Sequence, residues 1–202
     1  MTTTRPILVP IPEQFVGAHV LLRRLHEDDV DMLYTVLREA QPHLARWLPG
    51  FDVAPSAEDA LEGIRRLHAH WARRESFSMG IFARADGALV GDIRLRPGDW
   101  KIPAFDLAYW LHPAAEGHGY ARAAVRLLTA FAFETLHARR VMIACDKRNV
   151  RSRRVPESLG FPYEGCLRNH TLGADGQPFD MLIYAMIPAD YTHARASWPP
   201  EC

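Results

Sequence analysis

Apolar residues recur along the chain with two different periods, and the changes between them predict the order of helices and strands. Spacings of three and four residues, as in Val30, Leu33 and Leu37, are typical of a helix that buries one face. Short alternating or continuous apolar runs are typical of strands. The predicted strands cover residues 19–24, 77–84, 89–96, 105–112, 140–145, 161–171 and 179–186, and the predicted helices cover residues 27–42, 56–71, 119–133 and 149–159.

Proline and glycine residues mark several boundaries between these elements. Pro42 is expected to end the first helix, because proline lacks the backbone N–H that continues a helix. Asp86-Gly87 lies between two strand-like runs and predicts a hairpin turn. Gly160 is typical of the residue that follows the C-terminus of a helix.

The order of elements predicts an α/β protein with one mixed sheet, about seven strands and about four helices in a single domain. Residues 1–18 are rich in proline and aperiodic, so we expect an N-terminal arm. Residues 188–202 are polar and rich in proline, so we expect a C-terminal tail that frays. Residues 19–187 are left as the folded domain, and they contain neither an internal repeat nor a linker.

Length and composition are those of a globular domain with no overall charge. The chain has 202 residues, 48% of them hydrophobic, and its 24 basic residues balance its 24 acidic ones. Such a composition excludes wholesale disorder. A balanced charge provides no long-range field that attracts nucleic acid, and no apolar run reaches the roughly 20 residues of a membrane helix. We therefore expect neither nucleic acid nor a membrane as a partner.

The three cysteines and ten histidines predict neither a disulfide framework nor a metal centre. The cysteines are odd in number and form no CxxC pair, and residues 1–12 contain no signal-peptide core. We therefore expect the protein in the reducing cytoplasm. His68 and His70 are two residues apart, so they lie on different faces of a helix, and no HExxH sequence occurs.

One turn between a strand and a helix has the composition of an anion-binding site. Gly117 and Gly119 are separated by one residue, which lets the backbone approach a bulky ligand closely. N–H groups at a helix start have no partner within the helix and can bind a pyrophosphate without a basic side chain. A tight turn with ordinary capping is the alternative interpretation. Arg122 replaces the third glycine of GxGxxG and no GK[ST] follows, so neither a Rossmann turn nor a P-loop is predicted.

Several short motifs resemble, in the same order, those of the GNAT acyl-CoA N-acyltransferases, in particular the branch of bacterial ribosomal-protein N-terminal acetyltransferases. The phosphate turn of that family, Q/R-x-x-G-x-G/A, is similar to residues 116–121, and its N-x-x-S…LGF block resembles residues 149–161. The strand that holds the pantetheine arm resembles residues 109–111. The remaining matches are Leu22-Arg23 with Asp28-Asp29, Trp47-Leu48-Pro49, and Asp180 with Tyr184.

The resemblance implies a GNAT fold, acetyl-CoA or another acyl-CoA as the donor, and no metal. It implies acceptor contacts from Trp47 and Asp92. Arg154 is assigned to the 3′-phosphate of CoA, with a solvated surface position as the alternative. The full set of implied donor contacts is Trp110, Leu111, His112, Gly117, His118, Gly119, Tyr120, Ala121, Arg122, Asn149, Ser152 and Arg154.

The same resemblance implies direct attack of an amine on the thioester. The backbone N–H of Leu111 is expected to bind the thioester oxygen, and Ser152 is expected to donate to the departing thiolate. Asp106 is the first candidate for the base, because relatives commonly carry Glu at this place, and Asp92 is the second. The α-amine of a protein has a pKa near 8, so its deprotonation at neutral pH costs only about 1 kcal/mol and a weak base suffices.

Two residues depart from the family pattern. Glu116 stands where the family has Gln or Arg and brings a negative charge beside the expected pyrophosphate. Pro156 lies inside the predicted short helix, where it removes one N–H and leaves the Ser152 carbonyl without its usual partner. These departures motivate the alternative that the chain is an inactive CoA-binding regulatory module.

The acceptor stays open between two hypotheses at this point. The first is a protein N-terminal α-amine, such as that of a ribosomal protein, and the second is a small amine such as an antibiotic, a polyamine or a metabolite. A larger donor such as succinyl-CoA is a further alternative, because Arg94 and Arg96 could pair with its distal carboxylate. Relatives often pair through sheet edges, so a homodimer is also an expectation.

Overall fold

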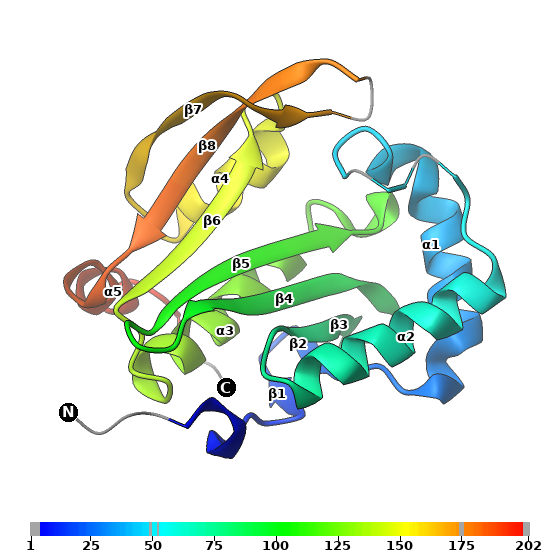
Figure 1. Cartoon of the computed structure of the whole chain (residues 1–202), viewed down its shortest axis with the longest axis horizontal. Coiled ribbons are helices and arrows are strands. Elements are labelled where there is room, and N and C mark those ends of the chain that lie inside the picture. The colour runs from blue at the N-terminus through cyan, green and yellow to red at the C-terminus, as the bar shows by residue number, and fades with distance from the viewer. Residues whose placement is uncertain (1–4, 49, 52, 174–175, 200–202) are drawn as a thin grey trace.

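An eight-stranded sheet forms the centre of the molecule and carries helices on both faces (Figure 1). The structure, a computed structural model, describes residues 5–48, 50–51, 53–173 and 176–199. All neighbouring strands are antiparallel except β5 and β6, which are parallel. In spatial order the strands are β1 (Gln14–Val16), β2 (Val20–Arg23), β3 (Phe77–Ala83), β4 (Leu89–Asp99), β5 (Ala104–Leu111), β6 (Arg140–Asp146), β8 (Pro178–Met186) and β7 (Tyr163–Leu172).

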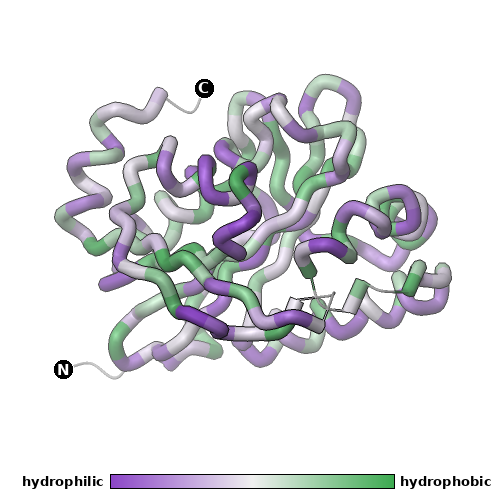
Figure 2. Tube along the Cα trace, turned by 90° about the horizontal axis from the view of Figure 1, so that it is seen from above, coloured by the Kyte–Doolittle hydropathy of each residue, from purple (hydrophilic) through white to green (hydrophobic). Residues whose placement is uncertain are grey.

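Two helices cover one face of the sheet, and three cover the other. The first pair contacts β3 and β4, whereas the other three helices lie against β2 to β6 and β8. In Figure 2 hydrophilic and hydrophobic residues alternate along the coiled segments of the trace, as is expected of helices with one buried face. The helices are α1 (Val30–Leu44) and α2 (Ala57–Ala72) on the first face, and α3 (Tyr120–Glu134), α4 (Val150–Ser158) and α5 (Pro188–Arg195) on the second.

Alternation along the strands supplies a separate core to each face. Ile81 and Phe82 are consecutive in β3, and both are buried, but they enter different cores because successive strand side chains point to opposite faces. Ile81 joins the large core under α3, and Phe82 packs with Leu33 of α1 and Ile64 of α2. The described helices that contact β5, β6 and β8 most all belong to the second layer, so no described helix packs closely on the first face of these strands (Figure 1).

The predicted mixed α/β sheet in one domain is confirmed. The turn at Asp86-Gly87 connects β3 to β4, and Gly160 follows α4 with a φ of +78°. Eight strands and five α-helices lie within the described residues, one more of each than expected. Both additions come from the terminal segments. Residues 14–16, inside the expected arm, form β1 and pair with β2.

The expected fraying of the C-terminal tail is wrong for its described part, because α5 and Trp198, three residues beyond its end, are packed on the domain. Tyr191, Ala194 and Trp198 are all buried. The Trp198 indole N–H donates to the Leu159 carbonyl at 3.2 Å. The spacing of these three residues is helical, but the prolines around them dominate the composition.

The expectation that Pro42 ends the first helix is also wrong, since α1 continues to Leu44. Pro42 removes only the donor to Arg38, whereas the next amide donors along the chain keep their bonds. The Ala45 N–H donates to Gln41 at 2.9 Å, and the Leu48 N–H donates to Leu44 at 2.8 Å. Among the described residues, no helix is both long and apolar enough to cross a membrane.

Candidate active site

The ladder between β5 and β6, the parallel neighbours at the centre of the sheet, stops before the strands end, and we call the unpaired stretch between their edges the slot. Their ladder pairs residues 104–107 with residues 140–143 and ends there, although β5 continues to Leu111 and β6 to Asp146 (Figure 1). Beyond Leu107 and Ile143 the facing edges of the two strands are therefore not paired with each other. Backbone N–H and C=O groups need partners, so these edges can bind a chain with amide groups that enters between them.

The turn that follows β5 reaches the open end of the slot and begins α3. Gly117 and Gly119 have φ values of +83° and +80°, which glycine adopts without strain. A Cβ atom built on Gly117 would meet no atom within 4 Å, and one on Gly119 would meet only the end of the Arg122 side chain, so the space beside the turn is open. No acidic residue lies in the first turn of α3. The free N–H groups of this turn can therefore hold a pyrophosphate.

The two histidines of this region bond to the turn itself. Nδ1 of His112 accepts from the Ala114 N–H at 3.2 Å. Nδ1 of His118 lies 3.0 Å from the Glu116 carbonyl, and its ring stacks on Tyr120 with centroids 5.7 Å apart. Both side chains thus brace the turn that the sequence assigns to the donor.

Glu116 connects the phosphate turn to two helices. Its carboxylate forms an ion pair with Arg151 of α4 and lies 3.1 Å from Nε2 of His43 in the last turn of α1. Burial, followed by the nearby Arg151, lowers the pKa of His43. A second contact joins the same elements, since Nε2 of His112 lies 3.4 Å from the Glu39 carboxylate. The negative charge of Glu116 is therefore compensated by Arg151 of α4, and His43 is a neutral neighbour near pH 7.

The start of α4 lies against β5 on the second face of the sheet. The Asn149 side chain caps this helix by accepting from the Ser152 N–H at 3.0 Å. Pro156 lies inside α4 and is buried, but the helix is not broken. The Ser152 carbonyl, which Pro156 deprives of its helical donor, accepts from the Tyr109 hydroxyl of β5 at 3.0 Å. Tyr109 thus supplies the missing bond and ties β5 to α4.

The Ser152 hydroxyl has two close neighbours, the Tyr109 hydroxyl and the Cys145 thiol. The Tyr109 hydroxyl oxygen also lies 3.4 Å from the Ser152 hydroxyl oxygen, but its single proton is used on the carbonyl. Burial raises the pKa of Tyr109 above its usual value. Burial also raises the pKa of Cys145, a neighbour in β6, to about 11, so the thiol stays protonated. Ser152 is the better placed of these groups to donate into the slot.

Asp92 lies on the first face of the sheet, opposite α3 and α4. Its register partner is Trp110, in the part of β5 that has left β6. Burial raises the pKa of Asp92 to about 7, and the charge of Arg94 opposes this shift. Within the described part of the chain, no hydrogen bond or ion pair holds its carboxylate. A carboxyl group with these properties can accept a proton near neutral pH.

Asp106 lies on the same face but in the part of β5 that still pairs with β6, opposite Met142. Its carboxylate accepts from Arg96 at 2.7 Å in an ion pair. The two candidate bases therefore differ in place and in partners: Asp92 lies beside the open slot without a partner, and Asp106 lies at its closed end with one.

Other residues singled out from the sequence lie farther along the same elements. Trp47 follows α1 and is half-buried, and Pro49 of the same motif lies outside the described residues. Arg154 is exposed on α4, and Arg122 on the first turn of α3. Sequence reasoning missed the roles of Tyr109, His43 and Arg151, although the orphaned carbonyl that Pro156 creates was a signal that a donor must lie nearby. No group of three or more His, Cys, Asp or Glu side chains suited to a metal occurs within the ranges described.

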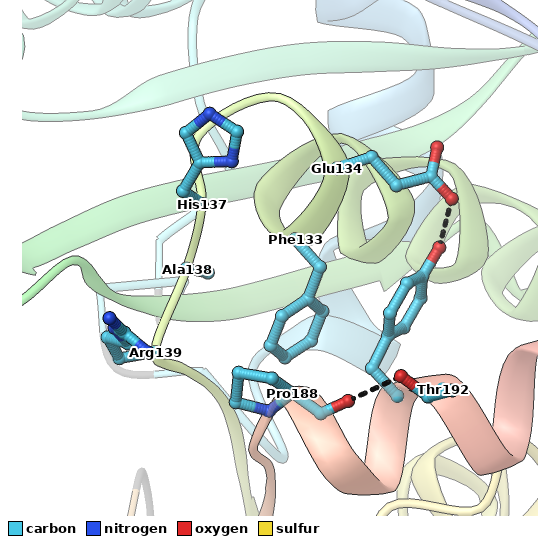
Figure 3. Close-up of a pocket in the computed structure, with 8 residues that line it drawn as sticks. Phe133, Glu134, His137, Ala138, Arg139, Pro188 and Thr192 are labelled. Carbon is cyan, nitrogen blue, oxygen red and sulfur yellow. Dashed lines mark hydrogen bonds between the residues drawn. The ribbon is translucent and has the colours of Figure 1, made fainter.

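A shallow pocket lies between the end of α3 and α5 and includes Phe133, His137 and Pro188 (Figure 3). It lies at the C-terminal end of α3, whereas the phosphate turn lies at the N-terminal end. A helix of 15 residues separates its ends by about 20 Å. The pocket is therefore no part of the slot.

Comparison with known proteins identifies the class that this fold and site define. A family profile described as an acetyltransferase (GNAT) domain matches residues 19–162. The "Putative ribosomal N-acetyltransferase YdaF" of Bacillus subtilis (strain 168) is 32% identical over 178 residues, which cover 87% of this chain and 95% of that protein. The chain therefore belongs to the GNAT acetyltransferase family and is an acyl-CoA-dependent N-acetyltransferase.

Solved structures agree with this assignment. A "putative ribosomal-protein-serine acetyltransferase" from Vibrio cholerae is 26% identical, with a TM-score of 0.74 over 90% of this chain and 100% of that one. The complex of RimL, named a ribosomal L7/L12 α-N-protein acetyltransferase, with coenzyme A has the same fold at 22% identity, with a TM-score of 0.77 over 86% and 96% of the two chains. The resemblance to the ribosomal-protein branch is thus confirmed.

Proposed function

We propose that this enzyme transfers an acetyl group from acetyl-CoA to the N-terminal α-amine of a protein, such as a ribosomal protein. One observation carries the proposal: the slot between β5 and β6 has a phosphate turn at its open end, Ser152 towards one face and Asp92 towards the other. The names of YdaF and of the Vibrio cholerae protein support a ribosomal acceptor.

The donor is held along the slot from the turn inwards. The free N–H groups at the start of α3 bind the pyrophosphate, and Gly117 and Gly119 keep the space beside them clear. Edge groups of residues 108–111 bind the amides of the pantetheine arm, because β6 does not pair with them. His118, Tyr120 and Asn149 fix the shape of the two helix starts around this arm.

The acceptor amine approaches from the first face of the sheet, where Asp92 takes its proton. An α-amine with a pKa near 8 and a carboxyl group with a pKa of about 7 exchange a proton at little cost near neutral pH. The neutral amine then attacks the thioester carbon. We assign the base to Asp92 in preference to Asp106, whose carboxylate is engaged with Arg96 at the closed end of the slot.

Two further groups act on the carbonyl oxygen and on the sulfur of the thioester. The Leu111 N–H lies at the free end of β5 and stabilises the oxyanion that forms when the C–N bond is made. As the C–S bond breaks, the electron pair goes to sulfur, and the Ser152 hydroxyl donates to the thiolate on the opposite face from the acceptor. The products are an acetylated amine and CoA.

The test is a screen of donors against acceptors with product masses measured. Acetyl-CoA and succinyl-CoA are each combined with peptides that match ribosomal-protein N-termini and with a set of small amines. Acetylation of peptide α-amines at rates above those of every small amine is the expected result. Turnover of small amines alone would reject the protein acceptor.

The alternative of an inactive CoA-binding module is not favoured. Its two motivating residues both have partners here: Arg151 compensates the charge of Glu116, and Tyr109 satisfies the carbonyl that Pro156 leaves free. Small amines and a succinyl donor keep their place in the screen.

A further inference from the structure

Three charged residues follow one another on the first face of β4, the face that α1 contacts. Asp92, Arg94 and Arg96 alternate with the buried Ile93 and Leu95, so their side chains share one face. In the register of the sheet they lie opposite Trp110, Ala108 and Asp106 of β5, respectively. The row of Arg94 and Ala108 is the first row beyond the end of the ladder between β5 and β6. Arg94 therefore lies where the slot begins.

Arg94 differs from the other arginines of this face in having no hydrogen-bonded or ion-paired partner among the described residues. Arg96 is paired with Asp106 at 2.7 Å, and Arg140 of β6 is paired with Glu164 of β7. No hydrogen bond or ion pair to Arg94 is made within the described part of the chain, and its side chain is exposed. The positive charge of Arg94 lowers the pKa of Asp92 and so opposes the increase that burial causes. The acidic groups of this face are thus either engaged elsewhere or, as Asp92 is, half protonated near neutral pH.

The surface beside Arg94 is apolar and has no helix over it. Ala108 and Ala144 are exposed, and Met142, Met181 and Ile183 are half-buried. The registers of β5, β6 and β8 place all five on the face of Arg94, whereas α3, α4 and α5 lie behind these strands (Figure 1). An extended chain can lie on this surface, with the slot beneath it.

We propose that Arg94 is a carboxylate-binding residue of the acceptor cleft and that the enzyme prefers reactants that carry a carboxylate close to the reacting amine or acyl group. This inference rests on the proposed function. A guanidinium presents two parallel N–H donors that match a carboxylate. Asp92 and Arg94 are two residues apart on one strand face, which is roughly 7 Å along the strand. One reactant can therefore place an amine at Asp92 and a carboxylate at Arg94 if the two groups are a few bonds to a few residues apart.

Two reactants can supply this carboxylate. An acidic side chain at the second or third position of an acceptor peptide reaches Arg94 when the α-amine lies at Asp92. The distal carboxylate of a dicarboxylic acyl group, as in succinyl-CoA, reaches it from the slot. The chemistry recognised is the same, and the two sources are separated by varying one reactant at a time.

The experiment compares Arg94→Gln with the unchanged enzyme on matched substrates. The acceptors are two hexapeptides that differ only by Glu or Gln at the second position, and a further pair that differs at the third. The donors are acetyl-CoA and succinyl-CoA with a Gln peptide. We expect the unchanged enzyme to prefer one carboxylate-bearing reactant about tenfold in kcat/KM, and Arg94→Gln to bring that ratio to about one. Arg96→Gln, on the same strand face, is the matched control and should keep the preference.

Each outcome decides the inference. Loss of a Glu preference identifies the acceptor as the source, and loss of a succinyl preference identifies the donor. Ratios that Arg94→Gln leaves unchanged overturn the inference while the proposed function stands. If no peptide is acylated, the proposed function falls, and the ratio between β-alanine and its amide, measured with both enzymes, then decides whether Arg94 binds a carboxylate.

Discussion

At the residue scale, the surroundings of Asp92 determine its protonation state. A pKa raised from its ordinary value near 4 to about 7 means that the folded protein favours the protonated carboxyl. The contribution of Asp92 to stability is therefore lost as the pH rises through about 7. Each pKa unit corresponds to about 1.4 kcal/mol.

Replacement of Asp92 by Asn tests both consequences. We expect Asp92→Asn to have a higher free energy of unfolding than the unchanged enzyme at pH 8 and a nearly equal one at pH 4, because the cost of ionising the buried carboxyl grows as the pH rises from about 4 to about 7 and is complete above that. The rate should fall at least tenfold, and the acid limb near pH 7 should disappear. Urea unfolding and a pH–rate profile measure the two effects. An acid limb that persists would transfer the base role elsewhere, with Asp106→Asn as the comparison.

Tyr109 supplies the hydrogen bond that Pro156 removes from α4. Tyr109→Phe leaves the Ser152 carbonyl without a donor, which should cost about 1–3 kcal/mol of stability. In a Pro156→Ala background the restored N–H at position 156 can serve this carbonyl, so the same substitution should cost less than about 1 kcal/mol. A double-mutant cycle measured by urea unfolding gives the difference. Equal costs in both backgrounds would contradict the arrangement.

At the scale of elements, the start of α3 joins the strand, the turn and the donor. A Cβ atom at Gly119 would occupy the space in which the pyrophosphate approaches, so Gly119→Ala should weaken acetyl-CoA binding at least tenfold in calorimetry. Gly87 is the matched control, since it has a φ of +75° and open space beside it in a distant hairpin. Both substitutions carry the same backbone strain of about 1 kcal/mol. Equal affinities for the two variants would reject the turn as the phosphate site.

Glu116 joins the same turn to α4 through Arg151. Arg151→Gln leaves Glu116 less compensated beside the pyrophosphate, so acetyl-CoA binding should weaken about tenfold, or 1.4 kcal/mol. Glu116→Gln in the same chain should restore most of the affinity, because it removes the repulsion. The exposed ion pair between Arg65 of α2 and Glu27, which lies just before α1, serves as the control. Absence of rescue would make Arg151 a plain phosphate ligand.

The sequence predicted the elements that local patterns specify, and it missed those that depend on contacts between residues far apart in the chain. Periodicity identified the central strands and helices, because their burial repeats with the period of the element. Tyr191 and Trp198 were missed, since only the packing of α5 on the domain reveals why a tail rich in proline is ordered. The position of Gly117 and Gly119 was predictable from local backbone geometry, whereas the contacts of Glu116 with His43 and Arg151 join residues far apart in the chain.

At the scale of the whole molecule, the C-terminal segment closes the core behind α4. The Trp198 indole is buried and bonded to Leu159, directly after the helix that carries Ser152. Trp198→Ala should therefore reduce the free energy of unfolding by about 3–5 kcal/mol. His193→Ala, on the exposed side of α5, should change it by less than about 0.5 kcal/mol. Similar values for the two variants in urea unfolding would show that the segment is not part of the core.

The short ladder between β5 and β6 has a consequence for the mechanics of the molecule. It divides the sheet into two leaves, β1–β5 and β6–β8, whose edges pair in the described chain through residues 104–107 and 140–143 and the adjoining bond from Arg139 to Pro103. A pantetheine arm hydrogen-bonded to both free edges would connect the two leaves beyond the end of the ladder. Because a ligand that binds only the folded state stabilises it, the donor would make the two leaves one rigid sheet, and amide hydrogen exchange in residues 108–111 would slow when it binds.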